Sequence, residues 1–146
     1  MALVHFIGHG KATREGARLA FQDRAGVAQL VSAQDFIAAA GTRVFLFFLN
    51  SCETATSLDT PVSNLAHALV RAGVPYALGM QFSVLEIAAL RLSEFFYAFL
   101  ARGNSVEESL LEARLALARD ENLTRVPMKD GSVADARAFA MGIPVL

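Results

Sequence analysis

Two residues capable of nucleophilic or proton-transfer chemistry follow apolar segments that have the length and composition of buried strands. His9 stands between two glycines directly after residues 3–7, and Cys52, the single cysteine, follows the apolar run at residues 44–49. If these strands are parallel neighbours, both side chains emerge at the edge of the sheet where open α/β folds bind ligands. The imidazole can there take the proton of the thiol or hold the thiolate as an ion pair. The pattern predicts a cysteine nucleophile with a histidine base.

Acyl-transfer chemistry also needs hydrogen-bond donors for the oxyanion that forms, and backbone N–H groups serve because they are fixed in place. Gly10 suits this role because it has no side chain to block its N–H, and the N–H of Cys52 is the natural second donor. The scattered His5 and His67 with one cysteine do not offer the ligand spacing of a metal site. The glycines around His9 also lack the rest of a dinucleotide fingerprint. We therefore expect neither a metal nor a cofactor.

Alternating strand and helix patterns must position these residues. We expect strands at residues 3–7, 44–49 and 75–80, a hairpin with arms at 18–22 and 27–31, helices at 33–40, 65–72, 84–101 and 105–119, and a last strand near 139–141. The loops after the three strands, at 8–11, 50–56 and 80–83, would carry the site. This order predicts an α/β fold with a mostly parallel central sheet and one inserted β-hairpin, in a single domain spanning residues 1–146.

Composition limits the classes of function. The 146 residues include 13 basic and 14 acidic side chains, a net charge of −1, so we expect no nucleic-acid partner. No apolar run is long enough for a membrane span, and a single cysteine suits a reducing, cytoplasmic setting. Hydrophobic residues make up 54% and charged residues 18%, which indicates either a sheet buried on both faces or an apolar surface that meets another chain.

Several segments form a pattern when taken in order. They are residues 3–10 (LVHFIGHG), 44–54 (VFLFFLNSCET), 65–79 (LAHALVRAGVPYALG) and 96–114 (FYAFLARGNSVEESLLEAR), with 139–144 (FAMGIP) as a closing strand. Together they resemble the CHAT domain, a caspase-like domain usually joined to tetratricopeptide repeats. The resemblance implies a caspase-like three-layer fold and a cysteine endopeptidase. In that family pattern His9 is the general base, Cys52 is the nucleophile, and the N–H groups of Gly10 and Cys52 form the oxyanion hole.

The resemblance also implies a protein or peptide substrate that lies extended beside a strand. Asn50, Gln81, Phe82 and Ser83 would contact it. Related metacaspase-type enzymes that favour basic residues have Asp two positions before the nucleophile. Asn50 stands there in this chain, so we do not transfer a preference for Arg or Lys. A sensor or repeat partner would switch the activity on.

The resemblance leaves one expectation about the extent of the chain and two alternatives to the peptidase. The family's fold begins with a strand and helix upstream of the histidine strand, so we expect this chain to lack its first strands and to self-associate through an exposed sheet edge. A catalytically inactive CHAT-fold domain used for assembly is the alternative to the peptidase. A different cysteine hydrolase, such as a glutamine-amidotransferase-like protein, is disfavoured because its nucleophile precedes its histidine, whereas His9 precedes Cys52 here.

Overall fold

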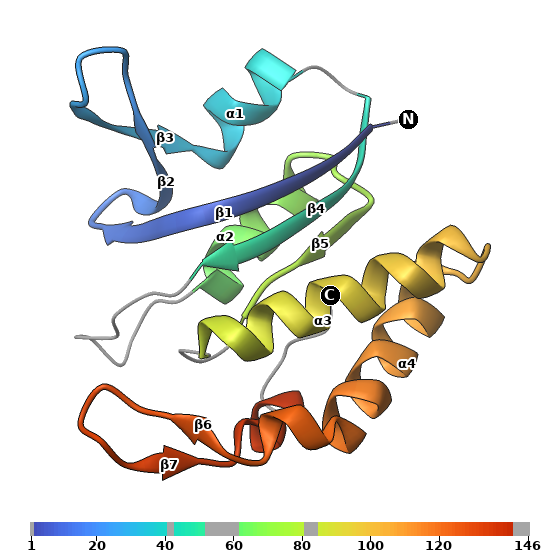
Figure 1. The fold of residues 1–146 in the computed structure, drawn as a ribbon. Helices are drawn as coiled ribbons and strands as arrows, with labels where there is room; N and C mark the ends of the chain where they lie inside the picture. The colour runs from blue at the N-terminus through green and yellow to red at the C-terminus, as the bar shows by residue number, and fades with distance from the viewer. Residues whose placement is uncertain (1, 41–42, 52–61, 81–84, 142–146) are drawn as a thin grey trace. The chain divides into compact units, whose positions relative to one another are not determined.

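The structure is a computed structural model that describes residues 2–40, 43–51, 62–80 and 85–141. They fall into two compact units, Met1–Ser83 with Ile143–Leu146, and Val84–Gly142. The elements, in chain order, are β1 (Ala2–Thr13), β2 (Gly16–Gln22), β3 (Ala28–Ser32), α1 (Ala33–Ala40), β4 (Val44–Ser51), α2 (Val62–Arg71), β5 (Tyr76–Leu78), α3 (Glu86–Ala101), α4 (Val106–Arg119), the 3-10 helix η1 (Glu121–Leu123), β6 (Val126–Pro127), β7 (Val133–Ala134) and the 3-10 helix η2 (Ala136–Met141) (Figure 1).

The first unit contains a five-stranded sheet in the order β3-β2-β1-β4-β5. Strands β1, β4 and β5 are parallel to one another, whereas β2 pairs antiparallel with both β1 and β3 (Figure 1). The strand β4 therefore has a neighbour on each side, as its continuous apolar run predicts. The α/β class, the parallel core and the β2–β3 hairpin are confirmed.

The strand β1 is longer than we predicted. It continues to Thr13, so residues 8–11 belong to the strand and do not form a loop. Residues His9 to Thr13 stay extended because they pair with β2, from His9↔Ala20 to Thr13↔Gly16. Neither Gly8 nor Gly10 is among the glycines with positive φ, so the turn expected around His9 is wrong.

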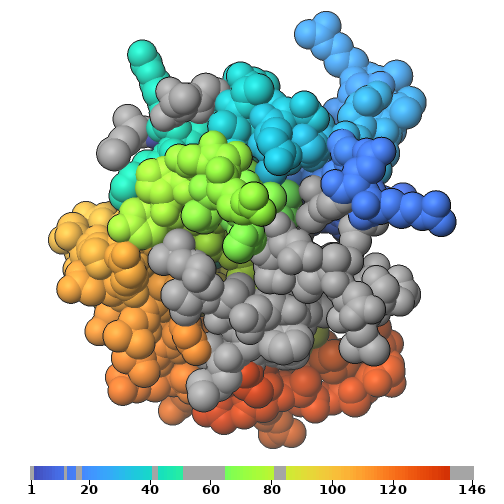
Figure 2. Space-filling model, turned by 180° about the vertical axis from the view of Figure 1, so that it is seen from behind, coloured from blue at the N-terminus to red at the C-terminus, as the bar shows by residue number. Residues whose placement is uncertain are grey.

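The helices α1 and α2 cover one face of this sheet. The core cluster there contains Phe6, Leu19, Phe47 and Leu49 from the strands, and Leu65 and Leu69 from α2, with Phe36 and Ile37 of α1 packed against it. Seen from behind, the cyan atoms of α1 and the green atoms of α2 lie side by side on this face (Figure 2). Alternate apolar residues of each strand therefore face these two helices, and the residues between them face the other side.

The second unit is built on the helical hairpin of α3 and α4. The helix α4 begins with a capping box, in which Ser105 Oγ accepts from the N–H of Glu108 and Glu108 Oε2 accepts from the N–H of Ser105. Serine followed three residues later by glutamate is the sequence signature of this box, and the structure confirms it. The last strand expected at residues 139–141 is wrong, because those residues end η2. Asp135 begins that turn by accepting the N–H of Arg137, and residues 142–144 of the expected strand lie outside the described residues.

Candidate active site

His9 lies where β1 changes its pairing partner. Residues 2–8 of β1 pair with the parallel strand β4, whereas His9 and the residues after it pair with the antiparallel strand β2. The His9 side chain is exposed. Gly10, predicted as an oxyanion donor in a loop, lies inside β1 and is the register partner of Leu19.

The parallel ladder between β1 and β4 ends at the pair Gly8↔Ser51. Register partners on neighbouring strands lie about 5 Å apart. His9 follows Gly8 in the chain, and Cys52 follows Ser51. The expectation that the two strands are parallel neighbours is confirmed. Cys52 itself lies outside the described residues, as do Gln81, Phe82 and Ser83, so the roles assigned to these four residues stay predictions.

Asn50 shares a face of the sheet with His9. Side chains alternate along a strand, so His5, Ile7 and His9 project to one side of β1. The register partners of His5 and Ile7 are Phe48 and Asn50. Asn50 is buried, with 6% of its surface exposed. The side chain predicted to contact substrate is therefore a neutral amide that lies beside the exposed His9 position.

Gly8 lies against an aromatic ring. A Cβ atom at Gly8 would lie 2.8 Å from Cζ of the Phe6 ring, so a side chain there would require that ring to move. The glycine therefore leaves room for the Phe6 ring beside the strand directly before His9.

The family model described as CHAT domain matches residues 1–134, which include every element from β1 to β7. The chain belongs to the CHAT domain family. A CHAT domain is a caspase-like domain related to cysteine peptidases. His9, Cys52 and Asn50 all lie within the matched range of this CHAT domain. A comparison with curated proteins gives no match.

The described part of this CHAT domain gathers no group of three or more metal-ligating side chains. None of its described helices is long and apolar enough to cross a membrane.

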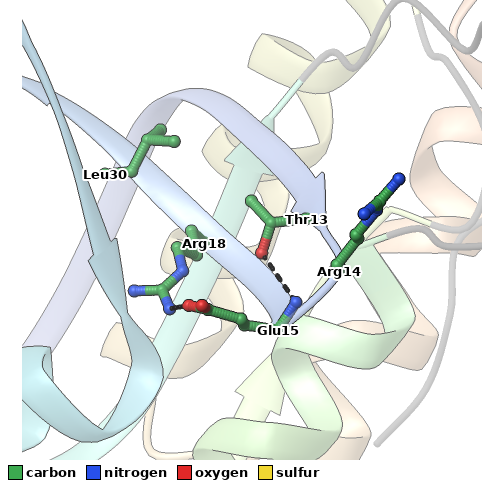
Figure 3. Close-up of a pocket in the computed structure, with 5 residues that line it drawn as sticks. All are labelled: Thr13, Arg14, Glu15, Arg18 and Leu30. Carbon is green, nitrogen blue, oxygen red and sulfur yellow. Dashed lines mark hydrogen bonds and ion pairs between the residues drawn. The ribbon is translucent and has the colours of Figure 1, made fainter.

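An open pocket lies on the CHAT sheet at the far end of β1 from Ala2. Thr13, Arg14, Glu15, Arg18 and Leu30 line it, and its volume is about 430 Å³ (Figure 3). Sequence reasoning missed this pocket, since it did not predict that β1 continues beyond His9 and pairs with β2. From the sequence we expect residues 8–11 in a loop, whereas the structure extends β1 to Thr13.

Proposed function

We propose that this CHAT domain is a cysteine endopeptidase in which His9 is the general base and Cys52 is the nucleophile. The parallel register of β1 and β4 carries the proposal, because its last pair, Gly8↔Ser51, leads directly into both residues. Register partners lie about 5 Å apart, and His9 and Cys52 each follow one member of this last pair in the chain. The exposed His9 side chain is open to a substrate.

The reaction proceeds in two stages. His9 takes the proton of the Cys52 thiol, and the thiolate attacks the carbonyl carbon of the peptide bond. The N–H groups of Gly10 and Cys52 stabilise the oxyanion, and the imidazolium returns its proton to the leaving amine as the C–N bond breaks. Water, deprotonated by His9, then attacks the thioester, which releases the carboxylic acid and restores the thiol.

Asn50 bears on the choice of substrate. Its buried amide has donors and an acceptor but no charge, so it lacks the carboxylate that would pair with Arg or Lys before the cleaved bond. We propose that the enzyme prefers a neutral residue there, and that Gln81, Phe82 and Ser83, which follow β5 in the chain, extend this contact. A partner that senses a signal would switch the activity on.

The test uses peptidyl acyloxymethyl ketones that vary the residue before the reactive group. Mass spectrometry of the full chain should find the adduct on Cys52, with neutral residues preferred. His9→Ala should lose the labelling, while His67→Ala, at an exposed position of α2, should keep it. Cys52 that reacts no faster than a free thiol, with or without His9, would overturn the peptidase and leave a non-catalytic CHAT domain that serves in assembly.

A further inference from the structure

One face of the sheet beside His9 carries cations on two adjacent strands. Alternation places Lys11 and Thr13 on the same side of β1 as His9. The register partner of Lys11 is Arg18 of β2, and the partner of Ala20, two residues further along β2, is Leu30 of β3. We call the surface formed by Lys11, Arg18 and Leu30 the basic face.

Of the two cations of the basic face, Arg18 pairs with one carboxylate, that of Glu15. Glu15 Oε2 accepts one hydrogen bond from Nη2 of Arg18 at 2.5 Å, and the Glu15 side chain is 78% exposed against 23% for Arg18. An ion pair so exposed contributes little energy, but it orients the guanidinium, which has four further N–H donors. The register partner of Arg18 on β3 is Ser32, whose hydroxyl donates to the Asp35 carboxylate. Arg14 extends away from Arg18 (Figure 3).

The pocket also has an apolar lining residue. Leu30 lines the same pocket as Arg18 and is 38% exposed (Figure 3). A ligand that covers the basic face would place a carboxylate near Arg18 and its register partner Lys11, and aliphatic carbon on Leu30. The side chain of Glu or Asp in an extended peptide provides both.

The sheet order gives the direction of that peptide relative to His9. The basic face lies on the β2 and β3 side of β1, whereas β4 and β5 lie on the other side. The residues proposed to contact the acyl part of the substrate belong to β4 or follow β5. The part of the substrate after the cleaved bond would cross β1 toward Arg18. The Cα atom of Arg18 lies about 8 Å from that of His9, a distance that two to three residues of extended peptide span.

We propose that the basic face is a subsite for an acidic residue of the peptide substrate, two or three residues after the cleaved bond. Its position relative to that bond rests on the proposed function, whereas the binding of an acidic peptide does not. The contact adds a specificity on the leaving-group side to the neutral preference proposed at Asn50.

Binding is tested on the full chain with Cys52→Ala, by fluorescence anisotropy of two labelled peptides with a free amino terminus. They differ only by Glu or Gln at their second and third positions. The Glu peptide should bind about three- to tenfold more tightly, and the difference should shrink as salt rises from 50 to 300 mM. Arg18→Gln or Lys11→Gln should reduce the difference, while Arg24→Gln, in the turn after β2, should keep it. Equal affinities, or an equal loss with Arg24→Gln, would overturn the subsite.

The placement is tested with the unsubstituted chain on a peptide library. A preference for Glu or Asp at the second or third position after the cleaved bond, lost in Arg18→Gln, supports it. An acidic preference found only before the bond would overturn it. A chain that cleaves nothing refutes the proposed function and this placement, yet the anisotropy experiment still decides whether the basic face binds an acidic peptide.

Discussion

The imidazole of His5 stacks on the ring of Phe48, its register partner in β4, with ring centroids 4.8 Å apart and planes 9° from parallel. Burial holds the pKa of His5 below its ordinary value of 6.5. The folded protein therefore binds this proton less readily than the unfolded chain does, and acid favours unfolding. We expect the contribution of His5 to leave stability unchanged above pH 7 and to lower it as the pH falls through 6.5. Denaturant unfolding between pH 7.5 and 5.5 measures this.

The matched variant is His5→Phe, which keeps an aromatic ring against Phe48 and cannot take up a proton. Its stability should fall less than that of the unsubstituted chain over the same pH interval. His67→Gln, at an exposed position of α2, controls for the loss of a histidine as such. Parallel pH profiles for His5→Phe and the unsubstituted chain would show that another group causes the acid sensitivity.

A substitution at Phe47 tests the packing of the core. It is fully buried, and its ring meets the ring of Phe36 edge-on at 4.9 Å. Phe47→Ala removes that contact and leaves a cavity, so the free energy of unfolding should fall by about 3–5 kcal/mol. Ile7→Ala, where the side chain is 68% exposed, should cost less than about 1 kcal/mol. Similar losses in the two variants would contradict the burial pattern of this sheet.

The sequence predicts secondary structure well where the spacing of apolar residues and the helix-capping residues indicate the same element. The bounds of α1, the β2–β3 hairpin and the capping box at Ser105 followed from apolar spacing and from the residues that begin helices. The extension of β1 could not be predicted, because Gly8 and Gly10 suggested a turn, and only pairing with β2 keeps those residues extended. The 3-10 helix at residues 136–141 was missed because its apolar residues have no distinguishing period.

The capping box provides a test of the second unit. Ser105→Ala removes the oxygen that accepts the N–H of Glu108, so it should lower the free energy of unfolding by about 1 kcal/mol. Ser105→Asp keeps an acceptor at the same position and places a negative charge at the positive end of the helix, so it should restore most of the loss. Equal destabilisation by the two substitutions would contradict the role assigned to the hydroxyl.

Asp120 joins α3 to the end of α4. One oxygen accepts from the backbone N–H and the side-chain amide of Asn122, and the other lies 3.2 Å from Nε of Arg91. The Asp120 side chain is only 6% exposed, so Asp120→Ala should cost about 1–3 kcal/mol in unfolding free energy.

The matched control for Asp120 is Glu94→Gln. Glu94 pairs with the same arginine but is 65% exposed, so its substitution should change the unfolding free energy by less than about 0.5 kcal/mol. An equal cost for the two variants in calorimetry or denaturant unfolding would mean that the buried contact with Arg91 has no special weight.

The candidate site was predictable in part. That the strands before His9 and Cys52 are parallel neighbours followed from their apolar composition and from the rule that ligands bind at strand ends. The basic face was not predictable, because Lys11 and Arg18 become neighbours only through the β1–β2 register. Two residues that pair across strands are not separated by a fixed period in the sequence. Their pairing can be predicted only when the turn that joins the strands is recognised.

The central claim is that His9 activates the Cys52 thiol. The most direct measurement is the rate at which iodoacetamide alkylates Cys52 between pH 5 and pH 9, compared between the unsubstituted chain and His9→Ala. A free thiol loses about tenfold in rate for each pH unit below about 8.5. We predict that the unsubstituted chain keeps most of its rate near pH 6.5, and that His9→Ala follows the free-thiol profile. Two coincident profiles, both matching a free thiol, would contradict the account.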